Sequence, residues 1–480
     1  MRRPRGAVRA GFWSRLAVVG LLALAVRVGY VLTVERGDEL PGDGFYYHQA
    51  ALLLADGEGF VDPARFVFGG AQETVFFGEE RATPSAATAL PAGHREPTAG
   101  HPPAWTVLLA AVSLAGLRSV LAHQLTAALV GSLGVIMVGV LGRELRRGWS
   151  HEAHEDERVG IVAAALASVY ACLWLSDGMV MSESLVVAVV ALTGYCAVRF
   201  ARGPSRATAV AMGAAGALAA LTRAEFLVYL PLLALTLICT RRAVWRSLLG
   251  PLLGAGLVLG VLLSPWVIRN SLAFDQLVLV SNGSGTVLVQ ANCDATYHGE
   301  KLGYWELYCG LPQPLGPQGE PLDEAQRDAV LRHRGLDYID GHRVRLVAVV
   351  IPARIGRMWA VYDPVQQLRF DVLVVGRNFR LSLLGLAQYY GLVPCAIAGA
   401  VVLRRRAQAL APMVLWPVTT TITAITAFGE TRYRIASDVV IVVLAACAVD
   451  ALIEHARRRS APPRQRQRAP SRPDSPGGAT

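Results

Sequence analysis

The chain has 480 residues, of which 53% are hydrophobic and 17% charged, and its mean hydropathy is +0.40. This composition is typical of an integral membrane protein with polar loops and excludes a soluble multi-domain protein. The formal net charge of +10 comes almost wholly from arginine, which lies between the hydrophobic runs and in the tail. The arginines therefore indicate membrane topology rather than a nucleic-acid-binding surface.

The hydrophobic runs predict an α-helical polytopic membrane protein with about ten spans. The first run follows a basic N-terminus and resembles a signal peptide, but no small-residue cleavage site follows it, so we expect an uncleaved span. Several runs are shorter than the ~20 residues that cross a bilayer at right angles. The predicted spans are 16–34, 119–142, 159–177, 184–200, 207–222, 226–240, 247–265, 381–403, 409–427 and 438–454.

Arginines next to alternate spans predict the orientation. With the N-terminus in the cytoplasm, every inside segment has arginines beside a span, as the positive-inside rule requires, and the C-terminus is also inside. Counting Pro102–Leu117 as a span would break this alternation, so we expect an interfacial helix there. The predicted regions are a basic N-terminus (1–15), a membrane domain (16–455), exported loops with interfacial helices (35–118 and 270–375) and a basic tail (456–480).

The second exported loop carries two cysteines, Cys293 and Cys309, on the side of the membrane where disulfides persist. We expect them to pair. In the same loop, residues 323–347 have a helical pattern and Val347–Tyr362 resembles a further interfacial helix. Residues 461–480 are rich in Pro, Arg and Ser, a composition typical of disorder.

The stretch from Gly42 to Gly57 follows the first span directly. Asp43 lies between two glycines, and Tyr47, Ala50 and Leu54 recur at helical spacing, which predicts a helix with one apolar face. Such a helix would lie in the membrane interface and hold the Asp43 carboxylate at the membrane edge. The alternative is that Asp43 only caps the helix, and this stretch alone favours the cap.

Ionisable residues in or beside hydrophobic spans are costly and usually functional. Here most of them fall on the predicted non-cytoplasmic face, and Arg27 lies near it within the first span. Carboxylates beside several arginines at headgroup level suit a phosphate-bearing lipid and a reacting hydroxyl. The residues are Asp43, His101, Asp177, Glu183, Arg223, Glu225, Arg269, Glu430, Arg432 and Arg434.

Each of these residues also has a structural explanation. Glu183 could be a helix-start charge, Arg223 and Glu225 could pair, and Arg432 and Arg434 could snorkel to the interface. Only their joint placement favours a functional site. The run His151-Glu152-Ala153-His154-Glu155 has metal-binding residue types, but it falls in a charged cytoplasmic loop, so we expect it to be solvated.

Several short motifs, taken in order, resemble the GT-C glycosyltransferases. Within them the chain is similar to bacterial family-39-like members, relatives of the dolichyl-phosphate-mannose protein mannosyltransferases and of the aminoarabinose lipid A transferase. The cysteine-bearing loop resembles actinobacterial members. The resemblance covers roughly residues 16–455. The motifs are Asp43 with Tyr46 and Tyr47, Gly57-Glu58-Gly59-Phe60, His101-Pro102-Pro103, Ser182-Glu183-Ser184, Leu221-Thr222-Arg223, Pro265-Trp266-Val267-Ile268-Arg269-Asn270 and Arg432-Tyr433-Arg434.

The resemblance implies a polyprenyl-phosphate-linked sugar as donor, transfer at the extracytoplasmic face of the plasma membrane and the first-loop aspartate, Asp43, as catalytic base. The chain departs from the family in two places. Gly100-His101 replace a Glu-Lys pair of the aminoarabinose transferases, so no metal site is assigned and a divalent cation stays open. Asp38-Glu39 is a nearby rival for Asp43, but no aromatic helix follows it directly.

We therefore expect Asp43 to be the base of an inverting transfer to a lipid, glycan or protein acceptor. Two other classes stay open: a transporter or flippase of a lipid-linked sugar, which would more typically show internal repeats and midplane charges, and a receptor or scaffold. The expected donor-phosphate ligands are Arg432, Arg434, Arg269 and Arg223, and the expected positioning residues are Tyr46, Tyr47, His101 and Glu183.

Overall fold

The computed structural model describes residues 11–37, 40–69, 90–147, 153–406 and 410–460. Within these residues the chain is helical, with isolated β-bridges and no strand. Six helices among them are long and apolar enough to cross a membrane. The protein is a polytopic helical membrane protein, as the sequence predicts. Asp38, Glu39, His151, Glu152 and the tail 461–480 lie outside the described residues.

All ten predicted spans form helices. The six long spans are α1 (Phe12–Thr33), α6 (Val120–Arg146), α8 (Glu183–Arg202), α11 (Trp245–Phe274), α18 (Phe379–Arg405) and α20 (Ile435–Ser460). The four shorter helices are α7 (Ala153–Val169), α9 (Arg206–Thr222), α10 (Tyr229–Thr240) and α19 (Ala411–Thr426). The number of crossings stays a prediction, because these four helices are shorter than a full span.

Two predicted boundaries differ most from the structure. Helix α7 ends at Val169 rather than near 177, because the chain turns through η3 (Ala171–Leu173) before α8. Helix α11 continues to Phe274, nine residues past the predicted end, so Arg269 lies inside a helix rather than beyond one. Pro265 stays within this helix even though it has no N–H for the helical hydrogen bond.

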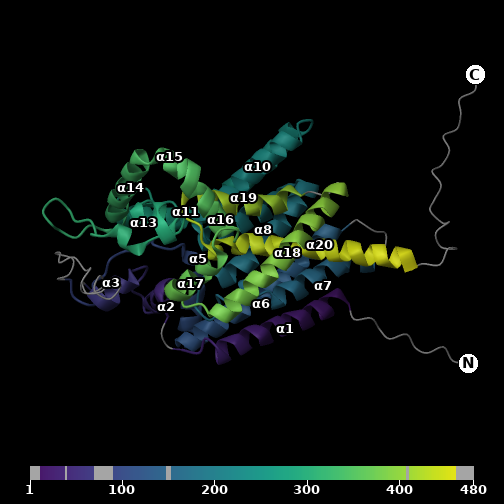
Figure 1. The fold of residues 1–480 in the computed structure, drawn as a ribbon, viewed down its shortest axis with the longest axis horizontal. Coiled ribbons are helices and arrows are strands. Elements are labelled where there is room, and N and C mark those ends of the chain that lie inside the picture. The colour runs from purple at the N-terminus through teal and green to yellow at the C-terminus, as the bar shows by residue number, and fades with distance from the viewer. Residues whose placement is uncertain (1–10, 38–39, 70–89, 148–152, 407–409, 461–480) are drawn as a thin grey trace, which may run out of the picture.

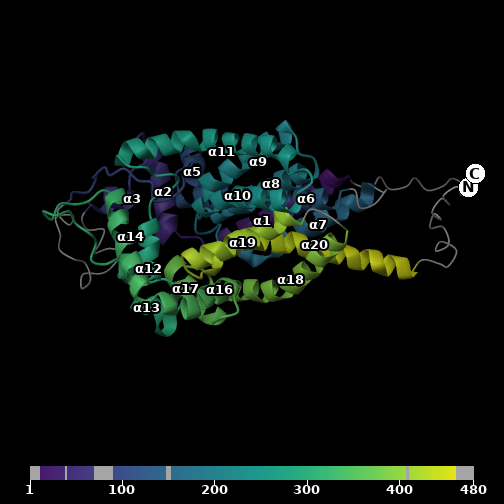
Figure 2. The same cartoon turned by 90° about the horizontal axis from the view of Figure 1, so that it is seen from above.

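The long helices run roughly along one direction, and the shorter elements of the two predicted exported loops gather at one end of them (Figures 1 and 2). Helix α1 begins and α20 ends at the opposite end of the bundle (Figure 1). The short helices are α2 (Gly42–Ala55), α3 (Pro63–Phe68), α5 (Pro103–Leu114), η4 (Ala224–Val228), α12 (Ser284–Ala291), α13 (Asp294–Tyr297), η5 (Gly299–Lys301), η6 (Leu307–Gly310), α14 (Glu324–Gly341), α15 (Arg343–Arg345), η7 (Leu346–Val350), α16 (Ile351–Met358), α17 (Pro364–Val375) and η8 (Thr431–Arg434).

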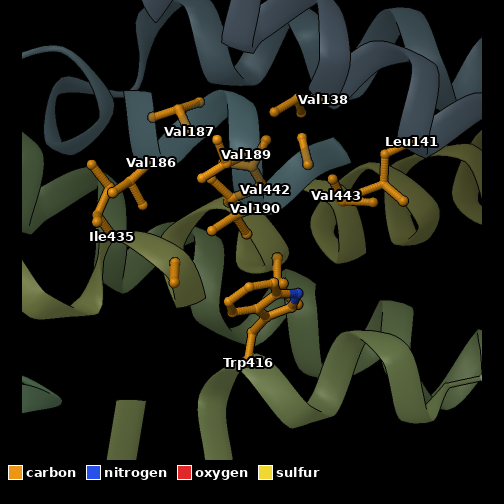
Figure 3. Packing of buried hydrophobic residues seen from close by; sticks show 14 of the residues in the cluster. Val138, Leu141, Val186, Val187, Val189, Val190, Trp416, Ile435, Val442 and Val443 are labelled. Carbon is orange, nitrogen blue, oxygen red and sulfur yellow. The ribbon is translucent and has the colours of Figure 1, made fainter. Parts of the chain in front are cut away.

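The main core lies where α6, α8, α19 and α20 meet, and it is built from small aliphatic side chains around the buried Trp416 (Figure 3). Glycines let neighbouring helices approach closely. A Cβ at Gly399 of α18 would lie 1.8 Å from the carbonyl oxygen of Leu444 in α20, so no larger residue fits. This rigid packing fixes the position of η8, which comes directly before α20 and carries Arg432.

A disulfide joins Cys293 to Cys309 in the second of the loops predicted to be exported. It closes the segment between α12 and η6, next to α14. Helices α2 and α5 pack on each other and bring the first exported loop onto the same end of the bundle. The two loops therefore meet the start of α20.

Candidate active site

Asp43 lies in the first turn of α2 and is not its cap. The N-cap is Pro41, and no side chain makes a capping hydrogen bond. Gly42 has φ +52°, a conformation that favours glycine, and a Cβ at Gly44 would lie 2.4 Å from the carbonyl oxygen of Met179. The two glycines thus allow the tight start of α2 and its close approach to the segment before α8.

A buried histidine pair fastens the middle of α2 to the bundle. His48 Nδ1 lies 2.9 Å from Nδ1 of His123 in α6, and His123 Nε2 lies 3.0 Å from Ser113 Oγ in α5. Because one Nδ1 of the histidine pair must donate and the other accept, at least one of the two rings is neutral. These hydrogen bonds join α2, α6 and α5 and so fix the position of α2, which carries Asp43.

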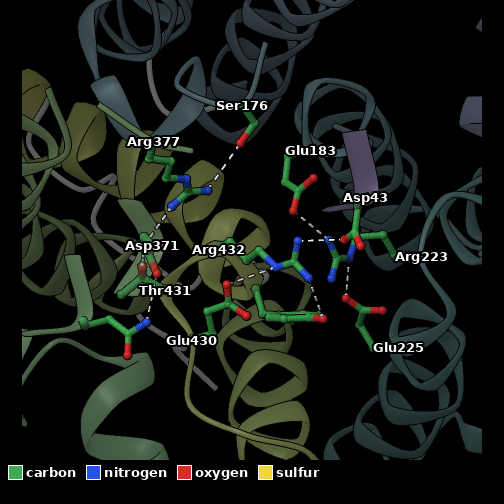
Figure 4. Close-up of polar contacts among 12 residues, drawn as sticks. Asp43, Ser176, Glu183, Arg223, Glu225, Asp371, Arg377, Glu430, Thr431 and Arg432 are labelled. Atoms are coloured by element: carbon green, nitrogen blue, oxygen red, sulfur yellow. Dashed lines mark hydrogen bonds and ion pairs between the residues drawn. The ribbon is translucent and has the colours of Figure 1, made fainter. Parts of the chain in front are cut away.

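Asp43 forms an ion pair with Arg432 of η8, at the far end of the sequence (Figure 4). Arg432 Nη1 donates to Asp43 Oδ2 at 2.8 Å across 389 residues of sequence. His101 Nε2 lies 3.7 Å from Asp43 Oδ1, and the His101 ring packs edge-on against Tyr46. The Asp43 side chain is 30% exposed, so the pair is open to a ligand.

The charges around Asp43 set its ionisation. Burial would raise the pKa of Asp43, but the nearby Arg432 guanidinium and His101 bring that pKa down to about 2. Burial lowers the pKa of His101 below its usual value, although Asp43 partly opposes this. At neutral pH the site therefore holds a carboxylate at Asp43 and a neutral imidazole at His101.

A second arginine, Arg223, lies beside the Asp43–Arg432 pair (Figure 4). Its Nη1 contacts Glu183 Oε1 at 3.0 Å, and its Nε donates to Glu225. Its guanidinium stacks over the Tyr433 ring at 4.4 Å from the ring centre. Arg223 and Glu225 do pair, as the structural explanation expects, but Glu183 and Tyr433 join them in the wall of the same site.

The Arg269 side chain binds backbone carbonyl groups and does not contact Asp43. Its guanidinium donates to the carbonyl oxygens of Thr98 and Phe60, each at 2.7 Å. Tyr46 OH lies 3.1 Å from Thr98 Oγ1, and Thr98 in turn donates to Glu324. These contacts shape the loop before His101.

Arg434 faces a small cavity behind Arg432. Its Nε contacts Asp438 Oδ1 at 3.1 Å, and it does not touch Asp43. The cavity, of about 30 Å³, is lined by three arginines, one carboxylate and several apolar side chains. The lining residues are Cys172, Leu175, Leu368, Arg377, Ser382, Leu386, Thr431, Arg432, Arg434, Ile435 and Asp438.

Within the cavity wall, Arg377 Nε and Ser382 Oγ are buried and have no hydrogen-bond partner among the described residues. Neither residue could be selected from the sequence, because their meeting depends on how α17 and α18 dock. Each of the three guanidiniums here has a carboxylate partner on this side of Arg432: Asp371 for Arg377, Glu430 for Arg432 and Asp438 for Arg434.

Two of the predicted charges pair elsewhere. Arg27 and Asp177 form a fully buried ion pair, and Ser184 Oγ donates to Asp177 at 2.6 Å. This contact explains the arginine in the first span as part of the packing of α1 against the start of α8. Neither residue reaches Asp43 by a described contact.

No group of three or more His, Cys, Asp or Glu side chains among the described residues is arranged to hold a metal ion. The residues around Asp43 therefore do not form a recognisable ligand set for a divalent cation. Every contact of the site described above is between protein side chains or backbone.

No protein-family model matches the chain, and the comparison with curated proteins gives no match. Several chains of solved structures resemble it, and two of them come from structures of one protein. The crystal structure of ArnT from Cupriavidus metallidurans bound to undecaprenyl phosphate has 15% identity and a TM-score of 0.39, over 94% of this chain and 80% of that one. The apo structure of the same protein also gives 15% and 0.39, over 93% and 78%. A likeness at this level assigns this chain neither a family nor a function.

Proposed function

We propose that the protein is a membrane glycosyltransferase that moves a sugar from a polyprenyl-phosphate donor to an acceptor hydroxyl on the extracytoplasmic face of the plasma membrane. The observation that carries the proposal is the open ion pair between Asp43 and Arg432. It places a carboxylate and a guanidinium, the groups that a hydroxyl and a phosphate need, side by side at one end of the helical bundle.

In the proposed reaction the acceptor oxygen forms a bond to the anomeric carbon while the bond from that carbon to the phosphate oxygen breaks. The electron pair leaves with the lipid phosphate, which needs no proton. The acceptor proton goes to Asp43, which is ionised because of its low pKa. One carboxylate base and a direct displacement invert the anomeric centre, in contrast to hydrolases that use two carboxylates.

In this proposal Arg432 lies between the part of the site that binds the donor phosphate and the part that binds the acceptor. The cavity behind it is lined by Arg377, Arg432 and Arg434 and supports binding of the lipid phosphate there. At about 30 Å³ the cavity has room for about two water molecules, so a phosphate enters only if side chains move apart. The side of Arg432 that carries Asp43 and Glu183 faces the acceptor.

The remaining predicted residues receive supporting roles in this proposal. His101 and Tyr46 position the substrate beside Asp43, and Tyr47 packs beneath them in the core. Glu183 and Arg223 hold the wall on the acceptor side. Arg269 acts on the loop backbone, so its contribution to phosphate binding is indirect.

The experiment uses purified protein, labelled polyprenyl-phosphate sugars and a panel of lipid, glycan and peptide acceptors. We expect release of free polyprenyl phosphate together with label in one acceptor class. Movement of the intact labelled lipid across proteoliposomes, without release of polyprenyl phosphate, would favour the flippase instead. Neither release nor transfer with any donor would reject the transferase.

A further inference from the structure

Glu430 is a buried carboxylate on the opposite side of Arg432 from Asp43 (Figure 4). It directly precedes η8 and is 1% exposed. Its Oε1 lies 3.2 Å from Arg432 Nε, but neither carboxylate oxygen has a hydrogen-bond partner among the described residues. Leaving a buried carboxylate without hydrogen-bond donors is costly, so its presence at this place requires an explanation.

The other charged groups that face Glu430 are already engaged. Asp371 of α17 accepts from Arg377 at 3.2 Å and from Thr431 Oγ1 at 2.9 Å. The aromatic hydroxyls nearby belong to Tyr304 and Tyr433. Behind Gly429, the guanidiniums of Arg354 and Arg357 donate to backbone carbonyls. Arg432 is thus the cation that Glu430 shares, and it shares it with Asp43.

We propose that Glu430 is a positioning residue that competes with Asp43 for the Arg432 guanidinium and thereby sets how free Asp43 is to take the acceptor proton. When Glu430 is neutral, the Arg432 guanidinium pairs with the Asp43 carboxylate alone and makes Asp43 a weak base. When Glu430 is ionised, the guanidinium is shared and Asp43 becomes the stronger base. The inference rests on the proposed transferase function for its kinetic consequence.

Glu430 changes its charge near neutral pH. Burial raises the pKa of Glu430 to about 7; Arg432 and, more weakly, Arg377 oppose this, and the charges of Asp371 and Asp43 reinforce it. Between pH 6 and pH 8, on the order of one unit either side of that value, Glu430 therefore changes from mostly neutral to mostly charged. Catalysis through Asp43 should rise across the same interval.

The first test needs no substrate. Infrared difference spectra of wild type minus Glu430→Gln, recorded over a pH series, follow the protonated carboxyl of Glu430. Its titration midpoint should lie near 7 in the wild type. In the Asp43→Asn background, the same difference should give a lower midpoint, because Arg432 then serves Glu430 alone. An equal midpoint in both backgrounds overturns the competition, whatever the protein catalyses.

The second test follows kcat against pH with a polyprenyl-phosphate sugar. The wild type should gain activity through pH 7, and Glu430→Gln should lose that rise and about tenfold to a hundredfold of kcat with little change in KM. Glu430→Asp should keep a rise, since it still titrates. Glu144→Gln is the matched control, because Glu144 is a buried carboxylate that pairs with Arg202 near the end of α6, and it should keep the wild-type profile.

The two tests separate the inference from the proposed function. A shifted midpoint without any sugar transfer at any pH rejects the transferase while the competition for Arg432 stands. Transfer by the wild type with an unchanged pH profile in Glu430→Gln overturns the role of Glu430 and leaves the transferase in place.

Discussion

The two ends of α20 each carry a network of arginines and carboxylates, and the networks differ in how completely they are paired. Near the end of α20, Arg146 of α6 contacts Asp450 and Glu454, and Arg158 and Arg406 also bind these carboxylates. Among the described residues, one carboxylate oxygen of this first network, Asp450 Oδ1, lacks a hydrogen bond, whereas at the start of α20 neither oxygen of Glu430 has a hydrogen-bond partner and Asp43 is 30% exposed. We call these the closed network and the open network.

The difference follows from what each network has to do. Charges buried in a membrane protein are tolerated when each has an opposite partner, and the closed network meets this condition while it locks α6 and α7 to α20. In the open network, buried carboxylate oxygens lack hydrogen-bond partners within the described part of the chain. This lowers the stability of the fold and is typical of a site that awaits a ligand. Burial of charge alone therefore does not identify a functional site, whereas incomplete pairing at an accessible edge does.

The largest expected effect comes from Asp43→Asn in the open network. This change keeps the size of the side chain but removes the proton acceptor, so kcat should fall ~10²–10⁴-fold. Turnover of a polyprenyl-phosphate sugar by purified protein measures it. Asp56→Asn is the matched control, because Asp56 ends the same helix and pairs with the exposed Arg118. Equal turnover in wild type and Asp43→Asn would reject Asp43 as the base.

Arg146→Ala tests the closed network. It removes the common partner of Asp450 and Glu454, and breaking such a buried pair costs about 3–5 kcal/mol of stability. Unfolding in detergent by heat or denaturant measures the loss, and the protein that stays folded should keep the wild-type kcat. Arg343→Ala, which breaks an exposed pair with Asp340, serves as control. A fall in kcat without lost stability would erase the distinction between the networks.

Arg432 stands in the open network and should respond differently. Arg432→Ala should lower kcat/KM by ~10²-fold, because it removes a charge-assisted contact to the leaving phosphate. Arg432→Lys should recover only part of this, since lysine keeps the charge but loses the planar fork. Donor titrations and steady-state kinetics separate binding from turnover. In the double variant Asp43→Asn, Arg432→Ala, the two losses in kcat/KM should not add, because the two side chains are in contact. Full additivity would contradict a shared site.

Much of this architecture is local and could be predicted from the sequence. The ten hydrophobic runs and the aromatic stretch after Gly42 specify their helices through periodicity, so all of them form where expected within several residues. The gathering of Asp43, His101, Arg223 and Arg432 followed from topology alone. Helix α17 was not predicted, because its apolar pattern is interrupted by Gln366, Gln367 and Arg369.

Pairing, in contrast, could not be predicted. Asp43 meets Arg432 across 389 residues, and the choice between Arg432 and Arg434 depends on which way η8 turns at the start of α20. The same holds for Arg269, which the mechanistic hypothesis includes among the phosphate ligands but which donates to the carbonyls of Thr98 and Phe60. Which charged side chains remain incompletely paired depends on how the helices pack.

The smallest effect concerns Glu324, which supports the loop beside the open network. Burial raises the pKa of Glu324 to about 7, although hydrogen bonds from Thr98 and the Ala99 N–H partly oppose this. The folded protein therefore binds a proton that the unfolded chain releases between about pH 4.5 and pH 7. Stability should fall as pH rises through this interval and then level off.

Glu324→Gln isolates this contribution, because glutamine cannot titrate, its oxygen can accept from the Ala99 N–H and Asn282, and its NH₂ can donate to Thr98 Oγ1. The difference in unfolding free energy between pH 5 and pH 8 should shrink by on the order of 1–3 kcal/mol relative to wild type. Unfolding at a series of pH values in one detergent measures it. A wild-type pH dependence in Glu324→Gln would mean that Glu324 is ionised in the folded protein and that the loop carrying His101 is held by a charged carboxylate.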